Sequence, residues 1–118
     1  MKKILIVDDK LQIRDLVQAE FEDEGFNVIL AEGGKEAIDK LSEIGYEVDL
    51  VILDIKMPDV DGLEVLNQIK MKNKTLPVIL LSAYPTFKEN FSTWAAEEYV
   101  VKSSDLSELK TKAAKYLF

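Results

Sequence analysis

Residues 49–62, which read DLVILDIKMPDVDG, contain the pattern that decides the fold. Within them, Leu50–Leu53 is a short, continuous run of branched apolar residues, and Asp54 follows it directly. Continuous rather than alternating apolarity indicates a strand covered on both faces, as in a parallel sheet. Ligands of such sheets bind beyond the carboxyl ends of the strands. Asp54 is therefore a candidate functional residue because of its position.

Four further apolar runs stand at regular intervals, at residues 4–7, 28–30, 78–81 and 99–101. Apolar residues recur at helical spacing within residues 13–21, 37–41, 66–69, 87–94 and 106–117. Gly25 and Gly45 are stop signals for the first two helices, and Ser104-Asp105 is a candidate cap for the last. Five alternations of strand and helix predict an α/β domain with a five-stranded parallel sheet and helices on both faces.

Composition excludes several classes of function. The 118 residues include 15 Lys and Arg against 22 Asp and Glu, a net charge of -7, so direct binding to nucleic acid or membranes is not expected. The chain has no histidine, so any phosphohistidine in its chemistry must come from a partner. It has no cysteine, no signal-peptide pattern and no apolar run long enough to span a bilayer. We expect a cytoplasmic protein whose residues 1–118 form one domain, without an output domain.

Polar side chains follow four of the five apolar runs: Asp8-Asp9, Asp54, Ser82 and Lys102. Each alone has an ordinary explanation, such as a solvated turn, a satisfied hydroxyl or a surface amine. Together they lie at one edge of the predicted sheet, where three carboxylates repel one another unless a cation is present. Oxygen ligands without nitrogen or sulfur favour Mg²⁺. With a lysine and a hydroxyl nearby, the set predicts a metal-assisted phosphoryl site that has a carboxylate nucleophile.

Four segments carry a family resemblance. They are ILIVDD at residues 4–9, DLVILDIKMPDVDG at 49–62, PVILLSA at 77–83 and EYVVK at 98–102. In sequence and order they resemble the response-regulator receiver domain of two-component signalling, and the resemblance covers essentially the whole chain. It implies a flavodoxin-like (βα)5 fold, doubly wound, with strand order 2-1-3-4-5.

The resemblance also implies a role for each site residue. Asp54 would accept the phosphoryl group, and Ser82 and Lys102 would bind its oxygens. Mg²⁺, with Mn²⁺ as a substitute, would be held by Asp8, Asp9, Asp54 and the backbone carbonyl of Lys56. Ser82 and Tyr99 would form the conformational switch that follows phosphorylation.

The implied partners are a sensor histidine kinase or phosphotransfer protein as donor, a downstream protein target, and a second copy on phosphorylation. The partner surface would include Ile13, Leu16 and Glu20 on the first helix and Trp94 on the fourth. The alternative for Ile13 and Leu16 is that both belong to the core, and for Trp94 that it is buried or half-buried.

Three positions depart from the family pattern. Lys10 stands where an acidic or small residue is common, which would modestly weaken Mg²⁺ binding. Ser103 replaces a proline that in the family often follows a cis peptide bond. A cis bond before a non-proline residue costs about 2.5–4 kcal/mol, so the orientation of the Lys102 side chain is in question. Ala95 stands where glycine commonly ends the fourth helix. Separately, the ring of Tyr84 would slow hydrolysis of the phosphorylated state if it borders the path of attacking water.

Three other functions compete with this interpretation. A flavin-binding protein shares the architecture, but Asp8-Asp9-Lys10 would repel the flavin phosphate. A dehalogenase-like phosphatase needs an Asp-x-Asp arrangement after the first strand, which the adjacent pair does not provide. A receiver that is never phosphorylated and acts only as a binding module is disfavoured by the presence of Asp54 and Lys102.

Overall fold

The structure is a computed structural model that describes residues 2–83 and 95–118. The strands are β1 (Lys3–Val7), β2 (Asn27–Ala31), β3 (Leu50–Leu53), β4 (Val78–Ser82) and β5 (Glu98–Val101). The helices are α1 (Leu11–Asp23), α2 (Gly34–Glu43), α3 (Gly62–Lys72) and α4 (Ser107–Leu117). The helix predicted over residues 87–94 lies outside the described residues.

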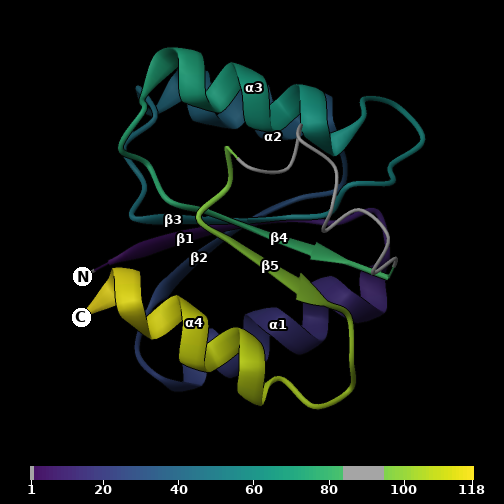
Figure 1. Cartoon of the computed structure of the whole chain (residues 1–118), viewed down its shortest axis with the longest axis vertical. Helices are drawn as coiled ribbons and strands as arrows, with labels where there is room; N and C mark the ends of the chain where they lie inside the picture. The colour runs from purple at the N-terminus through teal and green to yellow at the C-terminus, as the bar shows by residue number, and fades with distance from the viewer. Residues whose placement is uncertain (1, 84–94) are drawn as a thin grey trace.

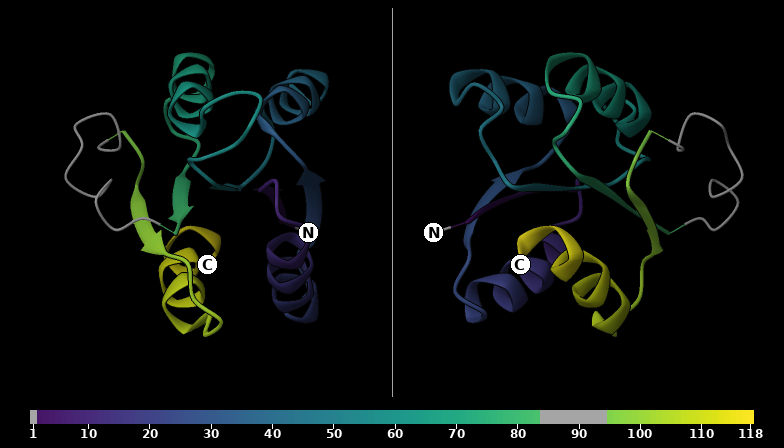
Figure 2. Two further views of the ribbon diagram at one scale, coloured as in Figure 1. Left: turned by 90° about the vertical axis from the view of Figure 1, so that its right-hand side faces the viewer. Right: turned by 60° about the vertical axis from the view of Figure 1, so that its left-hand side comes forward.

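All five strands form one parallel sheet in the order β2-β1-β3-β4-β5 (Figure 1). The predicted strand order 2-1-3-4-5 is confirmed. Helices α2 and α3 cover one face of the sheet, and α1 and α4 cover the other, as the turned views show (Figure 2). The central strands β3 and β4 are buried throughout, whereas the edge strands β2 and β5 are mostly half-buried. Continuous apolarity therefore predicted full coverage correctly for the centre of the sheet but not for its edges.

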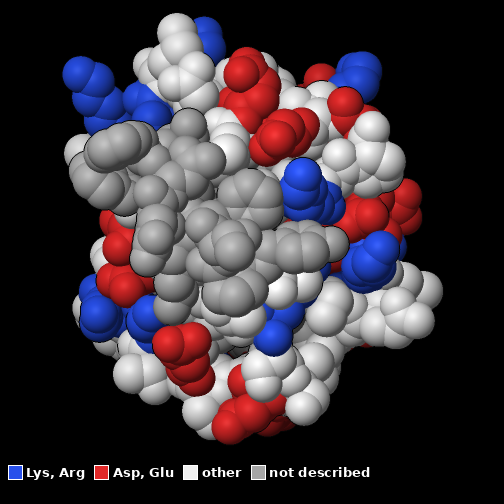
Figure 3. All heavy atoms as spheres, turned by 45° about the vertical axis from the view of Figure 1, so that its right-hand side comes forward, with Lys and Arg blue, Asp and Glu red and all other residues white. Residues whose placement is uncertain are grey.

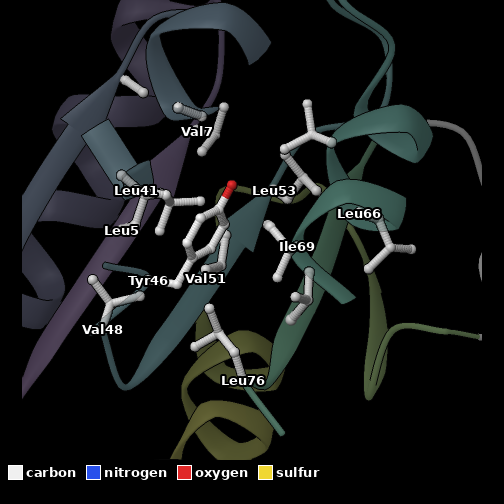
Figure 4. Packing of buried hydrophobic residues seen from close by; sticks show 14 of the residues in the cluster. Leu5, Val7, Leu41, Tyr46, Val48, Val51, Leu53, Leu66, Ile69 and Leu76 are labelled. Atoms are coloured by element: carbon white, nitrogen blue, oxygen red, sulfur yellow. The ribbon is translucent and has the colours of Figure 1, made fainter. Parts of the chain in front are cut away.

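The sheet separates two apolar clusters, because successive side chains of a strand point to opposite faces. In β1, Leu5 and Val7 belong to the cluster under α2 and α3, while Ile4 and Ile6 belong to the cluster over α1 and α4. Figure 4 shows the first cluster, with the ring of Tyr46 near its centre. Each fully buried Val, Leu, Ile or Phe side chain in these clusters stabilises the fold by about 1.5–3 kcal/mol. The two clusters hold the strands rigidly enough to position groups at their ends.

The predicted stop signals act at their expected places, whereas the predicted cap of the last helix is confirmed only for Asp105, since the N-cap residue of α4 is Leu106. Gly25 and Gly45 follow α1 and α2 with positive φ angles of 94° and 63°. Tyr46, the next residue after Gly45, also has a positive φ of 60°, a conformation that costs a non-glycine residue about 1–2 kcal/mol. Its N–H donates to the Leu41 carbonyl at 2.8 Å, which closes the end of α2. At the start of α4, Asp105 Oδ1 accepts from the Ser107 N–H at 2.9 Å.

The surface carries charges of both signs. On the face drawn in Figure 3, acidic and basic side chains are interspersed rather than gathered into one field. Among the described residues, no helix combines the length and the apolarity that crossing a membrane requires.

Helix α3 begins where its backbone touches the end of β3. The Gly62 N–H donates to the Ile55 carbonyl at 2.8 Å. A Cβ atom at Gly62 would lie 2.0 Å from the Asp54 carbonyl oxygen, so no other residue fits without moving backbone. Gly62 thus lets α3 start directly beside Asp54.

We predict that Gly62→Ala lowers the free energy of unfolding by about 3 kcal/mol or more, because the clash is with backbone rather than with a flexible side chain. Gly25→Ala is the matched control. Its Cβ would meet nothing within 4 Å, so only the positive φ should cost it, by about 1–2 kcal/mol. Urea unfolding followed by circular dichroism measures both. Equal losses in the two variants would contradict the steric argument.

Candidate functional site

The sheet itself brings the strand-end residues together. Backbone hydrogen bonds continue one residue beyond the strands: the Asp8 N–H donates to Ala31 at 3.2 Å, and the Asp54 N–H to Val7 at 2.9 Å. The Lys102 N–H donates to the Ser82 carbonyl at 2.7 Å in the same way. The first residue after each of these strands is therefore still held by the ladder. Its place depends on backbone bonds and not on attraction between the side chains.

Three carboxylates and one ammonium meet at this edge. Carboxylate oxygens of Asp8, Asp9 and Asp54 all lie within 4.8 Å of one another. Lys102 Nζ lies 2.8 Å from Asp8 Oδ2 and 3.3 Å from Asp54 Oδ2. Asp8 and Asp54 are buried, and Asp9 is half-buried. The site thus holds three acidic groups around one half-buried ammonium, and Lys10 adds a second positive charge only at its exposed rim.

Burial and repulsion perturb the acid-base chemistry of the site. Burial, followed by the charge of Asp8, raises the pKa of Asp54 from its ordinary 3.8 to about 6, although Lys102 acts in the opposite direction. Burial lowers the pKa of Lys102, but its close ion pair with Asp8 and the charge of Asp54 outweigh this and raise the pKa overall. Lys102 is therefore protonated at neutral pH, whereas the negative charge of Asp54 is only partly compensated by its surroundings.

The donor set fits a hard divalent cation. Asp8 Oδ2 is buried and makes no hydrogen bond of acceptable geometry, although Lys102 is near it. An open lone pair on a buried carboxylate, beside two more carboxylates, suits an ion such as Mg²⁺, which takes oxygen ligands and retains water. Asp8, Asp9 and Asp54 could hold it. Lys56 lies in the loop after Asp54 with its side chain exposed, so only its backbone is a candidate ligand.

The predicted switch residues lie on neighbouring strands. Ser82 is the last residue of β4, is fully buried, and pairs in register with Val101. Tyr99, on β5, is half-buried and packs against the cluster under α2 and α3. Its carbonyl accepts a hydrogen bond from Lys112 Nζ at 3.2 Å. Their role as a switch remains a prediction.

The predicted partner surface is described only in part. On α1, Leu16 is 38 % exposed, whereas Ile13 is half-buried and packs against the cluster over α1 and α4. The core alternative therefore applies in part to Ile13 and not to Leu16. Glu20 pairs with Lys110 of α4 at 3.3 Å. Trp94 lies outside the described residues.

The family departures leave the geometry of the site intact. Lys10 Nζ stands 3.8 Å from Asp9 Oδ2, so it adds positive charge at the rim. The Lys102–Ser103 peptide is trans, since the described residues contain no cis bond. With this trans peptide, the Lys102 ammonium still contacts the carboxylates of Asp8 and Asp54. Ala95 is exposed, and Tyr84 lies outside the described residues.

One buried residue of the site region was missed by the sequence analysis. Arg14 of α1 is only 6 % exposed, and its Nη1 donates to the Asp8 carbonyl at 2.7 Å. Its Nη2 lies 3.4 Å from Glu32, whose side chain is mostly exposed. The position of Arg14 at helical spacing beside apolar residues could have suggested a buried charge. Its partner could not be predicted, because a backbone carbonyl is present at every residue and has no sequence signal.

Comparison with known proteins identifies the family pattern. Residues 4–114 match the family model of the response regulator receiver domain. The chain is 34% identical over 118 residues to sporulation initiation phosphotransferase F of Bacillus subtilis, covering 98% of this chain and 94% of that protein. It spans about half or less of other curated relatives, such as 46% of the transcriptional regulatory protein YkoG of Bacillus subtilis, at 37% identity over 90% of this chain.

Solved structures agree with the fold. The response regulator TrrA of Thermotoga maritima, in complex with Mg²⁺-BeF, matches with a TM-score of 0.93 and 47% identity, covering 98% of this chain and 99% of that one. TrrA in complex with the histidine kinase ThkA gives a TM-score of 0.90, with 47% identity and full coverage of both chains.

We predict that Asp54→Asn makes the metal-free protein more stable at about pH 7.5, by about 1–3 kcal/mol. The folded-state pKa of Asp54 is raised to about 6, so the native state binds the proton more tightly than the unfolded chain does. Wild-type stability therefore falls as pH rises from about 4 to about 6, and the loss persists above that window. The advantage of the variant should vanish near pH 4. Urea unfolding with a chelator across this range measures it, and a pH-independent difference would refute it.

A second prediction concerns Arg14. Arg14→Met keeps the apolar stem but removes the donor to the Asp8 carbonyl, and should lower the free energy of unfolding by about 1–3 kcal/mol. Glu32→Gln removes only the exposed ion pair, which should cost about 0–1 kcal/mol. Thermal and urea unfolding compare the two. Should Glu32→Gln cost as much as Arg14→Met, the ion pair rather than the carbonyl contact would be the stabilising interaction.

Proposed function

This chain belongs to the response regulator receiver domain family, and from that premise we propose that Asp54 accepts a phosphoryl group from the phosphohistidine of a sensor histidine kinase or phosphotransfer protein. The chain is a signalling protein of the two-component type. The observation that carries the proposal is the buried cluster itself. Asp54 is 4 % exposed and stands 3.3 Å from the Lys102 ammonium, beside two more carboxylates. A signalling protein has no structural need for so costly a group of charges unless a ligand completes it.

The residues divide the chemistry among them. An Asp54 carboxylate oxygen forms the new P–O bond as the P–N bond of the donor phosphohistidine breaks, and the donor imidazole leaves with the bonding electron pair. Lys102 and the Ser82 hydroxyl would bind phosphoryl oxygens, aligning a group whose loose transition state needs positioning more than covalent help. Mg²⁺, held by Asp8, Asp9, Asp54 and the Lys56 carbonyl, would supply charge neutralisation. Mn²⁺ would substitute, since it also accepts carboxylate, carbonyl and water ligands.

The phosphorylated state would then act as the signal. The acyl phosphate would carry about 1.5–2 negative charges where the Asp54 carboxylate carried one, so phosphorylation adds up to about one charge and changes the balance around Lys102. We propose that Ser82 moves toward the new group and that Tyr99 turns inward in response, changing the surface offered to a downstream protein or to a second copy. The chain would catalyse its own phosphorylation from small donors and its slow hydrolysis. A cytoplasmic location belongs to the same proposal.

Two solved structures of one relative support the proposed ligands. TrrA was crystallised with Mg²⁺-BeF, and also with the histidine kinase ThkA. On this chain the exposed Leu16 of α1 lies on the helix that the resemblance assigns to kinase docking. A kinase partner and a Mg²⁺ cofactor are therefore the partners we propose.

Incubation with acetyl phosphate and Mg²⁺, followed by intact-mass measurement, tests the proposal. We expect wild type to gain the mass of one phosphoryl group and to lose it slowly. Asp54→Asn should gain none, and a chelator should prevent the gain in wild type. Lys102→Ala should retain folding but gain the group at least about tenfold more slowly, as expected when a charge-stabilising donor is removed.

The outcome separates two functions. A mass gain in wild type and none in Asp54→Asn supports phosphoryl acceptance. No gain in wild type, either from acetyl phosphate or from a phosphorylated histidine kinase, would favour a receiver that works only as a binding module. An equal gain in Asp54→Asn would assign the acceptor to another residue.

A further inference from the structure

The loop that leaves the site is tied to a neighbouring helix. Residues 54–61 connect β3 to α3 and include Lys56, the proposed carbonyl ligand. Near the tip of this loop, Asp59 Oδ1 accepts from the Gly34 N–H at 3.2 Å, and Oδ2 accepts from the Lys35 N–H at 3.1 Å. These two donors belong to the first turn of α2, whose own N-cap residue, Gly33, supplies no side-chain bond. Asp59 therefore caps a helix from another part of the chain.

Two adjacent glycines make room for this contact. A Cβ atom at Gly33 would lie 2.8 Å from both carboxylate oxygens of Asp59. A Cβ atom at Gly34 would lie 2.7 Å from Val60 Cβ and 2.8 Å from Val65 Cγ2. Real Cβ atoms do not tolerate such distances, so the glycine pair is shaped to receive the loop tip. We call Asp59 with Gly33 and Gly34 the loop clamp.

The loop clamp is favourable electrostatically as well as sterically. A carboxylate at a helix N-terminus meets the unpaired N–H groups and the positive end of the helix dipole. The backbone hydrogen bond from Lys35, followed by that from Val60, lowers the pKa of Asp59 below its ordinary value. Asp59 is thus ionised at neutral pH, the state in which both of its carboxylate oxygens accept hydrogen bonds.

The base of the same loop is fixed independently. The Gly62 N–H bonds to Ile55 at 2.8 Å, and Asp61 Oδ1 accepts from the Leu63 N–H at 2.8 Å. These bonds fix where the loop leaves β3 and where α3 begins. The clamp fixes the tip between them, three residues beyond Lys56.

We propose that Asp59 is a positioning residue whose clamp on Gly33 and Gly34 holds the Lys56 carbonyl toward the carboxylate cluster, and so sets the affinity for Mg²⁺. The inference rests on the proposed function. Mg²⁺ demands near-octahedral geometry and tolerates little ligand displacement. Residues that orient metal ligands typically change metal affinity about 10–100-fold when they are removed. Releasing the loop tip should therefore weaken Mg²⁺ binding without removing any ligand.

Four variants separate positioning from simple loss of charge. Asp59→Ala removes both the clamp and a negative charge. Gly33→Ala keeps that charge but forces the carboxylate away, and it adds no backbone strain because Gly33 is extended at φ -165°. Asp59→Asn keeps one side-chain oxygen as an acceptor. Glu36→Gln is the matched control, since Glu36 is the acidic residue in the first turn of the same helix and its carboxylate accepts from the Glu32 N–H rather than from Gly34 or Lys35.

Calorimetric titration with MgCl₂ alone, at constant ionic strength, is the test. We expect Asp59→Ala and Gly33→Ala to raise the Kd about 10-fold, with Asp59→Asn between them and wild type. Glu36→Gln should stay within about twofold of wild type, because an exposed charge is screened by salt. Circular dichroism and the unfolding transition establish that each variant is folded during the titration.

Three outcomes would overturn the inference. If Asp59→Ala and Gly33→Ala both bind Mg²⁺ as wild type does, the clamp does not position a ligand, although the proposed function stands. If Asp59→Ala weakens binding but Gly33→Ala does not, the effect comes from charge alone. If wild type neither binds Mg²⁺ nor gains a phosphoryl group, the proposed function fails and the inference fails with it. Should Asp59→Ala not fold, Asp59→Asn and Gly33→Ala decide the matter.

Discussion

Mutual repulsion among buried carboxylates is the constraint around which this molecule is organised. Asp8 and Asp54 are the first residues after two neighbouring strands. Because Val7 pairs with Leu53 in the parallel register, Asp8 and Asp54 lie side by side. Lys102 is the one cation within bonding reach of both in the described part of the chain. Burial, and after it the charge of Asp8, raises the pKa of Asp54 although Lys102 acts against both, so the raised pKa is a direct consequence of the fold.

The fold tolerates this site because its stability is generated elsewhere. Two apolar clusters, one on each face of the sheet, bury the central strands completely. The site is supported by contacts that do not neutralise it: Arg14 binds the carbonyl of Asp8 rather than its carboxylate. Asp59 fixes the neighbouring loop without entering the cluster. Arg14 and Asp59 thus hold the backbone near the acidic centre without occupying its carboxylate oxygens. Of these oxygens, Asp8 Oδ1 accepts from the Lys10 N–H at 2.9 Å, and Asp8 Oδ2 faces Lys102.

The parts of the structure that follow from local pattern were predictable, and those that depend on distant backbone groups were not. Apolar runs and the strand-end rule located Asp8, Asp54 and Lys102, because strand, turn and polar residue are contiguous in the sequence. Helix ends at Gly25 and Gly45 followed from the conformations that glycine permits. By contrast, Asp59 caps a helix that begins 25 residues earlier in the chain, and no spacing rule links a loop carboxylate to the N–H groups of another helix. The half-buried state of β2 is not visible in its own apolar run, although the strand order that the family resemblance implied already placed β2 at an edge of the sheet.

The backbone fixes the positions of Asp54 and Lys102, while the negative charge around them stays only partly balanced. These two features complement each other. If side-chain attraction held Asp54 and Lys102 in place, any change of charge at Asp54 would also disturb the fold. Here the main-chain bonds of Asp54 to Val7 and of Lys102 to Ser82 carry the geometry. Under the proposed function, the ammonium of Lys102 would exchange one anionic partner for another while its backbone N–H stays bonded to the Ser82 carbonyl. Such an arrangement would confine the conformational response to phosphorylation to side chains and to the loops beyond the strands. A reversible signal of this kind leaves the packed core unchanged.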